Sequence, residues 1–366
     1  MRRLALGLVF LAGPVVAADP PEPLPAAQLA AIEAAIGSFM TQGGVPGLTT
    51  AVVVGRELRW TKGFGVADVE NAVPARPGTM YRLASVSKPI TAVAVLQLVE
   101  RGRIDLDAPV RRYVPGFPEK PWPVTSRQLL AHFGGIRHYV TGERLDATRR
   151  YVSVLEGLDV FKDDPLVHEP GTSYLYSSYG YNLLGAVVEA ASGMRFEDYL
   201  RKNVLDPAGI ETIRDDGGGV PIPNRAGGYV RTPAGEVRNA PPADTSYKVP
   251  GGGLLGTAPD VARFASALEN GVLLRRDTLS GMLTRQKTKT GRTVGYGLGW
   301  DLRERKGRRE AVHSGGQEGV SNILYLQPDH GLAVVILTNL QESHPLPLAR
   351  RIADILSPRA SESVHR

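Results

Sequence analysis

The chain has 366 residues, a formal charge of +6 at pH 7 and no cysteine. The absence of cysteine excludes disulfides, a thiol nucleophile and zinc sites built on Cys. The charge is mild for this length, two of its units come from Arg2 and Arg3, and no basic helix accompanies it, so we predict no nucleic-acid partner. A chain of this length can bury a large core.

The first residues have the pattern of an export signal. Arg2 and Arg3 precede an apolar run over residues 4–16, and the small residues Ala17 and Ala18 follow. This order predicts a signal peptide over residues 1–18, cleaved after Ala17 or Ala18, and hence a periplasmic or secreted protein. An uncleaved membrane anchor is the alternative. No later segment is predicted to span a membrane.

The elements that follow a Pro-rich linker, residues 19–25, fall into three groups. A helix over 26–40 precedes two strands over 49–54 and 58–66. A mostly helical middle contains helices over about 85–102, 125–130, 145–160, 179–191, 196–203 and 257–268, with a Gly- and Pro-rich segment over 206–250. Three strand-like stretches, 296–302, 311–326 and 332–340, precede a last helix over 345–356.

This order predicts an α+β fold of the α/β-sandwich type. Strands at both chain ends predict one antiparallel sheet that is built from the two ends and flanked by helices. We expect a single domain over residues 26–356, with a mostly helical subdomain inserted at roughly 103–250 and a C-terminal tail over 357–366.

One short motif in the middle predicts chemistry. In Ser85-Val86-Ser87-Lys88, a helix that starts near Ser85 places the hydroxyl and the amine on one face, about 5–6 Å apart at Cβ. The helix N-terminus also favours an oxyanion. Two common residues at this spacing recur by chance, and the alternative is a Ser N-cap followed by a solvated lysine.

Two further motifs follow in order. Tyr176-Ser177-Ser178 lies on a turn before a helix, and His313-Ser314-Gly315-Gly316 lies on a strand-like stretch. With Ser-x-x-Lys they resemble the serine β-lactamase and penicillin-binding-protein superfamily. The flanks, such as Pro170-Gly171-Thr172 and Tyr296-Gly297-Leu298-Gly299-Trp300, look like class C β-lactamase-related hydrolases of the peptidase S12 type. Gly135-Ile136-Arg137-His138-Tyr139 is most similar to LACTB-like proteins. The resemblance covers about residues 26–356.

The resemblance implies a serine hydrolase that works through a covalent acyl-enzyme. Ser85 would be the nucleophile, and Lys88 with Tyr176 would supply the base, the lysine charge lowering the pKa of the phenol. The backbone N–H groups of Ser85 and Gly316 would form the oxyanion hole. His313 would position a substrate carboxylate or help to protonate the leaving group.

The substrate is less well defined by the resemblance. Ser178, Ser314 and Gly315 would contact it, but Ser178 stands where Asn is typical and His313 replaces a common lysine. We therefore expect cleavage of a peptide, amide or ester bond in a small molecule or peptide, and slow β-lactam turnover. A true β-lactamase or D,D-carboxypeptidase is one alternative. A non-catalytic binding or sensing protein on the same fold is another.

Other candidate groups are set aside. Tyr174, Tyr179 and Tyr181 compete with Tyr176, but only Tyr176 matches the motif register. The remaining histidines, among them His132, show no paired metal spacing, so we predict no metal and no cofactor. The sequence carries no signal for an oligomeric state.

Overall fold

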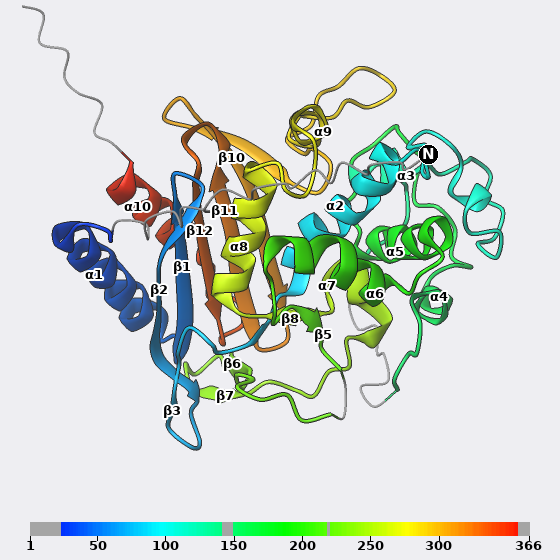
Figure 1. Ribbon diagram of the computed structural model, residues 1–366. Helices are drawn as coiled ribbons and strands as arrows, with labels where there is room; N and C mark the ends of the chain where they lie inside the picture. Colours follow the sequence, from blue (N-terminus) through cyan, green and yellow to red (C-terminus); the bar gives the residue numbers. More distant parts are fainter. Residues whose placement is uncertain (1–22, 141–148, 218–219, 358–366) are drawn as a thin grey trace, which may run out of the picture.

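A computed structural model of the chain describes residues 23–140, 149–217 and 220–357. Its centre is a seven-stranded antiparallel sheet in the order β3-β2-β1-β12-β11-β10-β9 (Figure 1). Both chain ends contribute, because β1 pairs with β12. The strands are β1 (Gly47–Val54), β2 (Glu57–Asp68), β3 (Val73–Pro74), β9 (Asp301–Arg305), β10 (Arg308–Gln317), β11 (Val320–Gln327) and β12 (Leu332–Thr338).

The C-terminal part contributes four strands, where three were predicted. Residues 311–326 form the hairpin of β10 and β11, and its turn contains Gly319 at φ 78°. The apolar character on both sides hides this turn in the sequence, although glycine is the residue that adopts such a φ without strain. The predicted strand over 296–302 begins only at Asp301, and Tyr296 makes an isolated bridge to it.

The apolar residues of β12 alternate between two cores. Ala333, Val335 and Leu337 belong to the larger core, on the side of α8 (Ala258–Glu269). Their neighbours Val334 and Ile336 belong to the core that α1 (Ala26–Gly43) and α10 (Leu346–Leu356) cover. This alternation is the period of two of a strand that is buried on both faces. Figure 1 shows α1 and α10 on one side of the sheet and α8 on the other.

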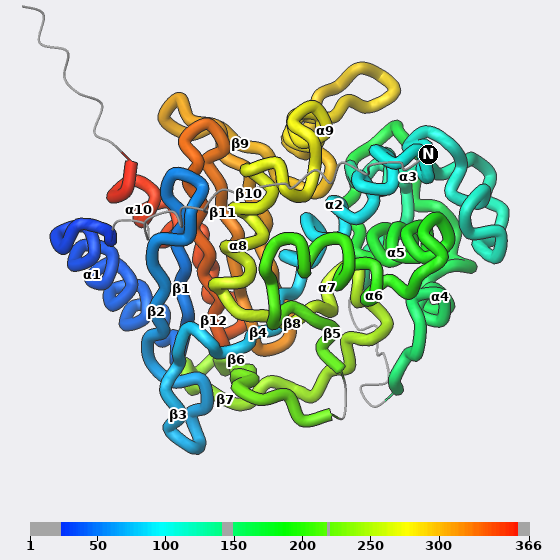
Figure 2. Tube along the Cα trace, viewed as in Figure 1, coloured from blue at the N-terminus to red at the C-terminus, as the bar shows by residue number. Residues whose placement is uncertain are grey.

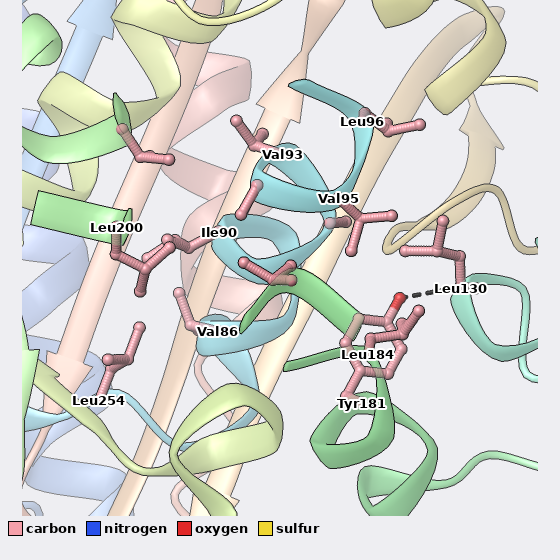
Figure 3. Packing of buried hydrophobic residues seen from close by; sticks show 14 of the residues in the cluster. Val86, Ile90, Val93, Val95, Leu96, Leu130, Tyr181, Leu184, Leu200 and Leu254 are labelled. Carbon is pink, nitrogen blue, oxygen red and sulfur yellow. Dashed lines mark hydrogen bonds between the residues drawn. The ribbon is translucent and has the colours of Figure 1, made fainter. Parts of the chain in front are cut away.

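Helix α2 (Ser87–Glu100) lies inside the larger core. Every residue from Ser87 to Leu98 is buried, so over these residues no face of the helix meets water. Figure 3 shows Ile90 of α2 packed near Leu200, with Tyr181 and Leu184 beside Leu130. The helix begins two residues later than predicted, because residues 84–86 form the 3₁₀ turn η1 (Ala84–Val86).

The middle of the chain forms the helical region that faces α2 (Figure 2). A side-chain cap marks the start of some of its short helices, as at Thr125, whose capping box with Gln128 confirms the predicted helix start. Of the predicted helix over 145–160, residues 145–148 lie outside the described part, and only one helix and a 3₁₀ turn form after Ser153. The helices are α3 (Ser126–Leu130), α4 (Val154–Gly157), α5 (Ser178–Ser192), α6 (Phe196–Leu200), α7 (Val249–Gly252) and α9 (Arg276–Met282).

Two small sheets connect this region to the rest. One contains β4 (Tyr81–Arg82), β8 (Leu254–Gly256) and β5 (Arg214–Asp215), and the other β6 (Tyr229–Arg231) and β7 (Val237–Asn239). The predicted signal peptide lies outside the described residues. Among the described helices, none has the length and apolarity needed to cross a membrane.

Candidate active site

Ser85 lies in η1, directly before α2, and its side chain is partly exposed. The preceding Ala84 has φ 50°, a left-handed conformation that is uncommon for a residue with a side chain and that concentrates at functional sites. The neighbouring Ser87 is buried and structural: its Oγ donates to the Ala84 carbonyl at 2.7 Å and accepts from the Leu254 N–H at 3.3 Å. Of these two serines, Ser85 is the one that a substrate can reach.

The Lys88 ammonium nitrogen lies among three oxygen atoms. They are Ser85 Oγ at 3.0 Å, Ser178 Oγ at 2.9 Å and the Gly251 carbonyl oxygen at 2.6 Å. The lysine side chain is fully buried, which contradicts the alternative of a solvated lysine after a Ser N-cap. No side chain caps α2 either. The structure therefore brings Ser85, Lys88 and Ser178 together.

Burial decides the charge of Lys88. It lowers the pKa of the ammonium well below its usual value, and the positive charge of Lys248 lowers this pKa further. Among the described residues, no carboxylate forms an ion pair with Lys88. The three oxygens are those of two hydroxyls and an amide, which suit a neutral amine as well as an ammonium.

Tyr176 stands beside Lys88, whose Nζ lies 4.8 Å from the centre of the phenol ring. Burial raises the pKa of Tyr176 above its usual value, and the hydrogen bonds with Ser85 and Ser178 lower it by less. The prediction that the lysine charge lowers this pKa is therefore wrong in sign. Desolvation of the phenolate is the largest cause of the raised pKa, and the nearby tyrosines Tyr139 and Tyr174 raise it further.

The competing tyrosines are placed differently. Tyr181 is fully buried and its hydroxyl donates to the Leu130 carbonyl at 2.8 Å. Tyr179 is also fully buried and stacks on Phe161. Tyr174 is exposed to 38 %. Of these tyrosines, Tyr176 is the one whose hydroxyl meets both Ser85 and Ser178.

His313 has both ring nitrogens engaged. Its Nδ1 lies 2.9 Å from the Ser314 carbonyl oxygen, which can only accept, so Nδ1 carries the proton. Its Nε2, 3.0 Å from the Tyr296 hydroxyl, then accepts from that O–H. Burial, with the charge of Lys88, lowers the pKa of His313 to about 3. The imidazole is neutral near pH 7 and presents no charge to a substrate carboxylate.

The remaining predicted residues lie on an unpaired edge of β10. Strand β9 pairs with β10 only up to Val312, so residues 313–317 have a strand partner on one side only, in β11. Gly315 is buried against Leu83 and Ala84, whereas Ser314 and Gly316 are exposed. An exposed strand edge beside Ser85 is a place where an extended ligand can add as a strand.

His132 is a residue of the site that sequence reasoning missed. Its Nδ1 accepts from the Ser177 N–H at 3.1 Å, and its ring centre lies 4.3 Å from that of Tyr176 and 4.7 Å from that of Tyr296. Burial lowers its pKa well below the usual value, so it is neutral. In the sequence this residue stood out only as a histidine without a partner at metal-binding spacing. The described residues contain no group of His, Asp or Glu suited to a metal ion.

Asn182 was also missed. Its Oδ1 accepts from the Gly251 N–H at 3.1 Å and its Nδ2 donates to the Tyr247 carbonyl at 3.0 Å. It lies one helical turn after Ser178. Helix α5 therefore contributes both a hydrogen-bond partner of Lys88 and the amide that holds the segment from Tyr247 to Gly251. A cavity of about 550 Å³ adjoins the site, lined by Tyr174, Tyr296, Asp301 and residues 292–295.

A helix-flanked antiparallel sheet with a serine, a buried lysine and a tyrosine beside one strand edge is the arrangement of the β-lactamase and penicillin-binding-protein superfamily of serine hydrolases. The family model described as Beta-lactamase matches residues 32–357, and the chain belongs to this family. The resemblance expected from the motifs is thereby confirmed.

Relatives within the family have diverse names. The serine beta-lactamase-like protein LACTB, mitochondrial, of Homo sapiens is 31% identical, covering 81% of this chain and 74% of that protein. Esterase EstB of Burkholderia gladioli is 30% identical, and the match covers 90% of this chain and 96% of that esterase. The octameric penicillin-binding protein homologue from Pyrococcus abyssi superposes with a TM-score of 0.78 at 26% identity, covering 90% of this chain and 77% of its own. The D-amino acid amidase from Ochrobactrum anthropi shares the fold, with a TM-score of 0.79 at 23% identity over 90% of this chain and 99% of its own.

Proposed function

We propose that this protein is an exported serine hydrolase that cleaves ester, amide or peptide bonds through an acyl-enzyme on Ser85. The observation that carries this proposal is the 3.0 Å contact between Ser85 Oγ and the Nζ of a fully buried Lys88. A serine hydroxyl is a weak nucleophile unless a neighbouring base takes its proton. Lys88, whose pKa is lowered by burial, is the neighbouring group that can take this proton.

The three oxygens around Lys88 match the valence of a neutral amine. The Gly251 carbonyl can only accept, and Ser178 Oγ accepts a second N–H. The nitrogen lone pair then points to the remaining partner, Ser85, whose O–H donates to it. In this arrangement the proton moves from Ser85 to Lys88 as Oγ attacks the substrate carbonyl.

Tyr176 has the properties of the acid in this scheme. Its raised pKa keeps the phenol protonated, and its hydroxyl meets Ser85 and Ser178, the two hydroxyls that also contact Lys88. The proton on Lys88 reaches the leaving group through Tyr176. During deacylation a water attacks the acyl carbonyl and gives its proton to the same base, and the released Ser85 oxygen regains a proton. The backbone N–H groups of Ser85 and Gly316 are proposed to hold the oxyanion, and one such donor is typically worth about 3 kcal/mol.

Small esters and peptides are the favoured substrates. A β-lactam is held by its side-chain amide and its carboxylate, but Ser178 replaces the usual amide and His313 is neutral. An ester needs only the nucleophile, the base and the oxyanion hole. The 30% identity to an esterase supports this choice.

A panel of substrates tests the proposal. We expect Ser85-dependent hydrolysis of p-nitrophenyl butyrate or a D-Ala peptide, and nitrocefin turnover slower by orders of magnitude. The Ser85→Ala protein is the blank. Rapid nitrocefin hydrolysis without ester or peptide cleavage would identify a true β-lactamase. Absence of all three activities, with binding retained, would favour a non-catalytic binding protein.

Export is a separate part of the proposal. It is supported by the Arg2-Arg3 pair, the apolar run over 4–16 and Ala17-Ala18. We expect the mature protein, isolated from its native host, to begin at Ala18 or Asp19 and to fractionate outside the cytoplasm. An intact Met1 on cytoplasmic protein would contradict this part without affecting the chemistry.

A further inference from the structure

We propose that Lys248 selects substrates that carry a carboxylate on the acyl side of the scissile bond. Its ammonium group would bind this carboxylate. The inference deepens the proposed hydrolase function and rests on it. It concerns a residue that no motif points to, on the loop that precedes α7.

Lys248 is a buried cation without an anionic partner. Its side chain is exposed to only 5 %, and among the described residues no hydrogen bond or ion pair to its ammonium is present. The ammonium instead lies over two aromatic rings, 5.2 Å from the centre of Tyr139 and 5.4 Å from that of Tyr247. Burying an unpaired charge is strongly unfavourable, so such a residue is a candidate for ligand binding.

The charges around Lys248 leave it available. Asp216 is the nearby buried acid, but it is bound by Arg82 at 2.7 Å and by Arg225 at 2.5 Å. Glu318 raises the pKa of Lys248, but it forms no ion pair with it in the described part of the chain. Burial is the larger effect and lowers that pKa to about 8, so the amine is mostly charged at pH 7.

Lys248 belongs to the catalytic framework. Three residues further on, Gly251 accepts the hydrogen bond from Lys88, and the charge of Lys248 acts on Lys88 directly. The neighbouring Tyr247 is fixed by Asn182 of α5. The lysine therefore lies on a segment that two hydrogen bonds fix to the framework around Lys88.

The direction along β10 assigns the acyl side. Gly315 lies against Leu83 and Ala84, next to Ser85, near the middle of the unpaired edge. The His313 end leads to Tyr296 and the cavity of about 550 Å³, and we assign it to the leaving group. The opposite end leads to Glu318, which lines one pocket with Arg82, and Arg82 donates to the Ala243 carbonyl at 2.9 Å, five residues before Lys248. A substrate along this edge therefore places its acyl portion toward Lys248.

A matched pair of esters tests this inference. The anionic substrate is the mono-p-nitrophenyl ester of adipic acid, and the neutral substrate is the methyl ester of the same compound, so the two differ in one charge. We expect wild type at pH 7 to prefer the anionic ester about tenfold in kcat/KM. Lys248→Met should reduce the anionic-to-neutral ratio at least fivefold, and Lys248→Arg should keep most of it. The Ser85→Ala rate is subtracted throughout.

The anionic-to-neutral ratio of kcat/KM separates a loss of carboxylate recognition from a general loss of activity. A wild-type enzyme without charge preference would overturn the inference, and so would a Lys248→Met protein in which both esters slow equally. If Lys248→Met does not fold, as thermal melting would show, the wild-type preference and the Lys248→Arg ratio decide.

A binding measurement separates this inference from the hydrolase proposal. In the Ser85→Ala background, monomethyl adipate should bind more tightly than dimethyl adipate, and adding Lys248→Met should remove the difference. Lys248-dependent binding without any ester hydrolysis would refute the hydrolase function and support the inference. Ser85-dependent hydrolysis without charge-dependent binding would support the hydrolase function and refute the role of Lys248.

Discussion

Gly315 of β10 is packed directly on Leu83, two residues before Ser85, the proposed nucleophile. A Cβ added to Gly315 would lie 2.3 Å from the Leu83 carbonyl oxygen, a distance that real contacts do not reach. The strand edge and η1 are therefore in contact only because residue 315 has no side chain. This contact sets the position of Ser85 relative to the β10 edge.

Gly315→Ala should separate β10 from η1. Overpacking of this kind costs about 1–3 kcal/mol, or more when backbone must move, so we expect a Tm lower by several degrees and weaker labelling of Ser85. Gly316→Ala is the matched control for stability, because a Cβ there meets nothing within 4 Å. Equal Tm values for the two variants would contradict the close contact.

Tyr176→Phe should lower kcat by about 10²–10⁴-fold, the usual contribution of acid–base assistance. It removes the hydroxyl that meets Ser85 and Ser178 while keeping the ring beside Lys88. Tyr181→Phe is the comparison, since its ring also lies near Lys88, at 5.6 Å, but its hydroxyl donates to Leu130. That change should cost about 1 kcal/mol of stability and affect kcat far less. A kcat unaffected in Tyr176→Phe would leave the acid–base role to Lys88 alone.

The pH dependence of kcat/KM should report Lys88. The neutral amine is the active form, so activity rises with pH through a pKa well below the usual lysine value. His313, with a pKa of about 3, adds no change between pH 5 and 8. Because the charge of Lys248 lowers the pKa of Lys88, Lys248→Met should move the rising limb to higher pH. A limb at unchanged pH would show that the two amines do not interact.

Glu269 should make stability fall with pH. Both its carboxylate oxygens are buried at the end of α8 without a hydrogen-bond partner among the described residues. Burial raises its pKa to about 8, against the opposing charge of Arg56, and the unfolded value is about 4.3. The folded state therefore binds this proton more tightly, and stability is lost as pH rises from the unfolded pKa through about 8.

The Glu269→Gln variant tests this directly, because an amide cannot ionise. Its Tm should be close to that of wild type near pH 5 and several degrees higher at pH 8.5. Glu57→Gln, at a side chain exposed to 61%, should show no such divergence. Parallel melting curves for wild type and Glu269→Gln across this range would refute the assignment.

The parts of the fold that could be predicted depend on local signals. The start of α8 was fixed by Thr257 as N-cap, with Pro259 and Asp260 in its first turn, and the structure shows Thr257 accepting from the Asp260 N–H. Ser85 and Lys88 are three residues apart, so their proximity follows from one helical turn. The resemblance to a known family then indicated that the three motifs, which are far apart in the sequence, belong to one site.

The parts that could not be predicted depend on distant packing. Gly251 meets Lys88 across 163 residues of sequence, and neither neighbourhood signals the other. The burial of Lys248 and His132 depends on the packed core, not on their flanking residues. The sign of the Tyr176 pKa shift failed for the same reason, since desolvation is a property of the folded state.

The most direct test of the account is covalent labelling of the nucleophile. Wild-type protein treated with a fluorophosphonate should gain the mass of one adduct, and peptide mapping should place it on Ser85. Ser87→Ala, which removes the buried structural serine two residues away, should still be labelled if it folds, whereas a folded Ser85→Ala should not. An adduct that persists in Ser85→Ala, or that maps to another residue in wild type, would contradict the proposed acyl-enzyme.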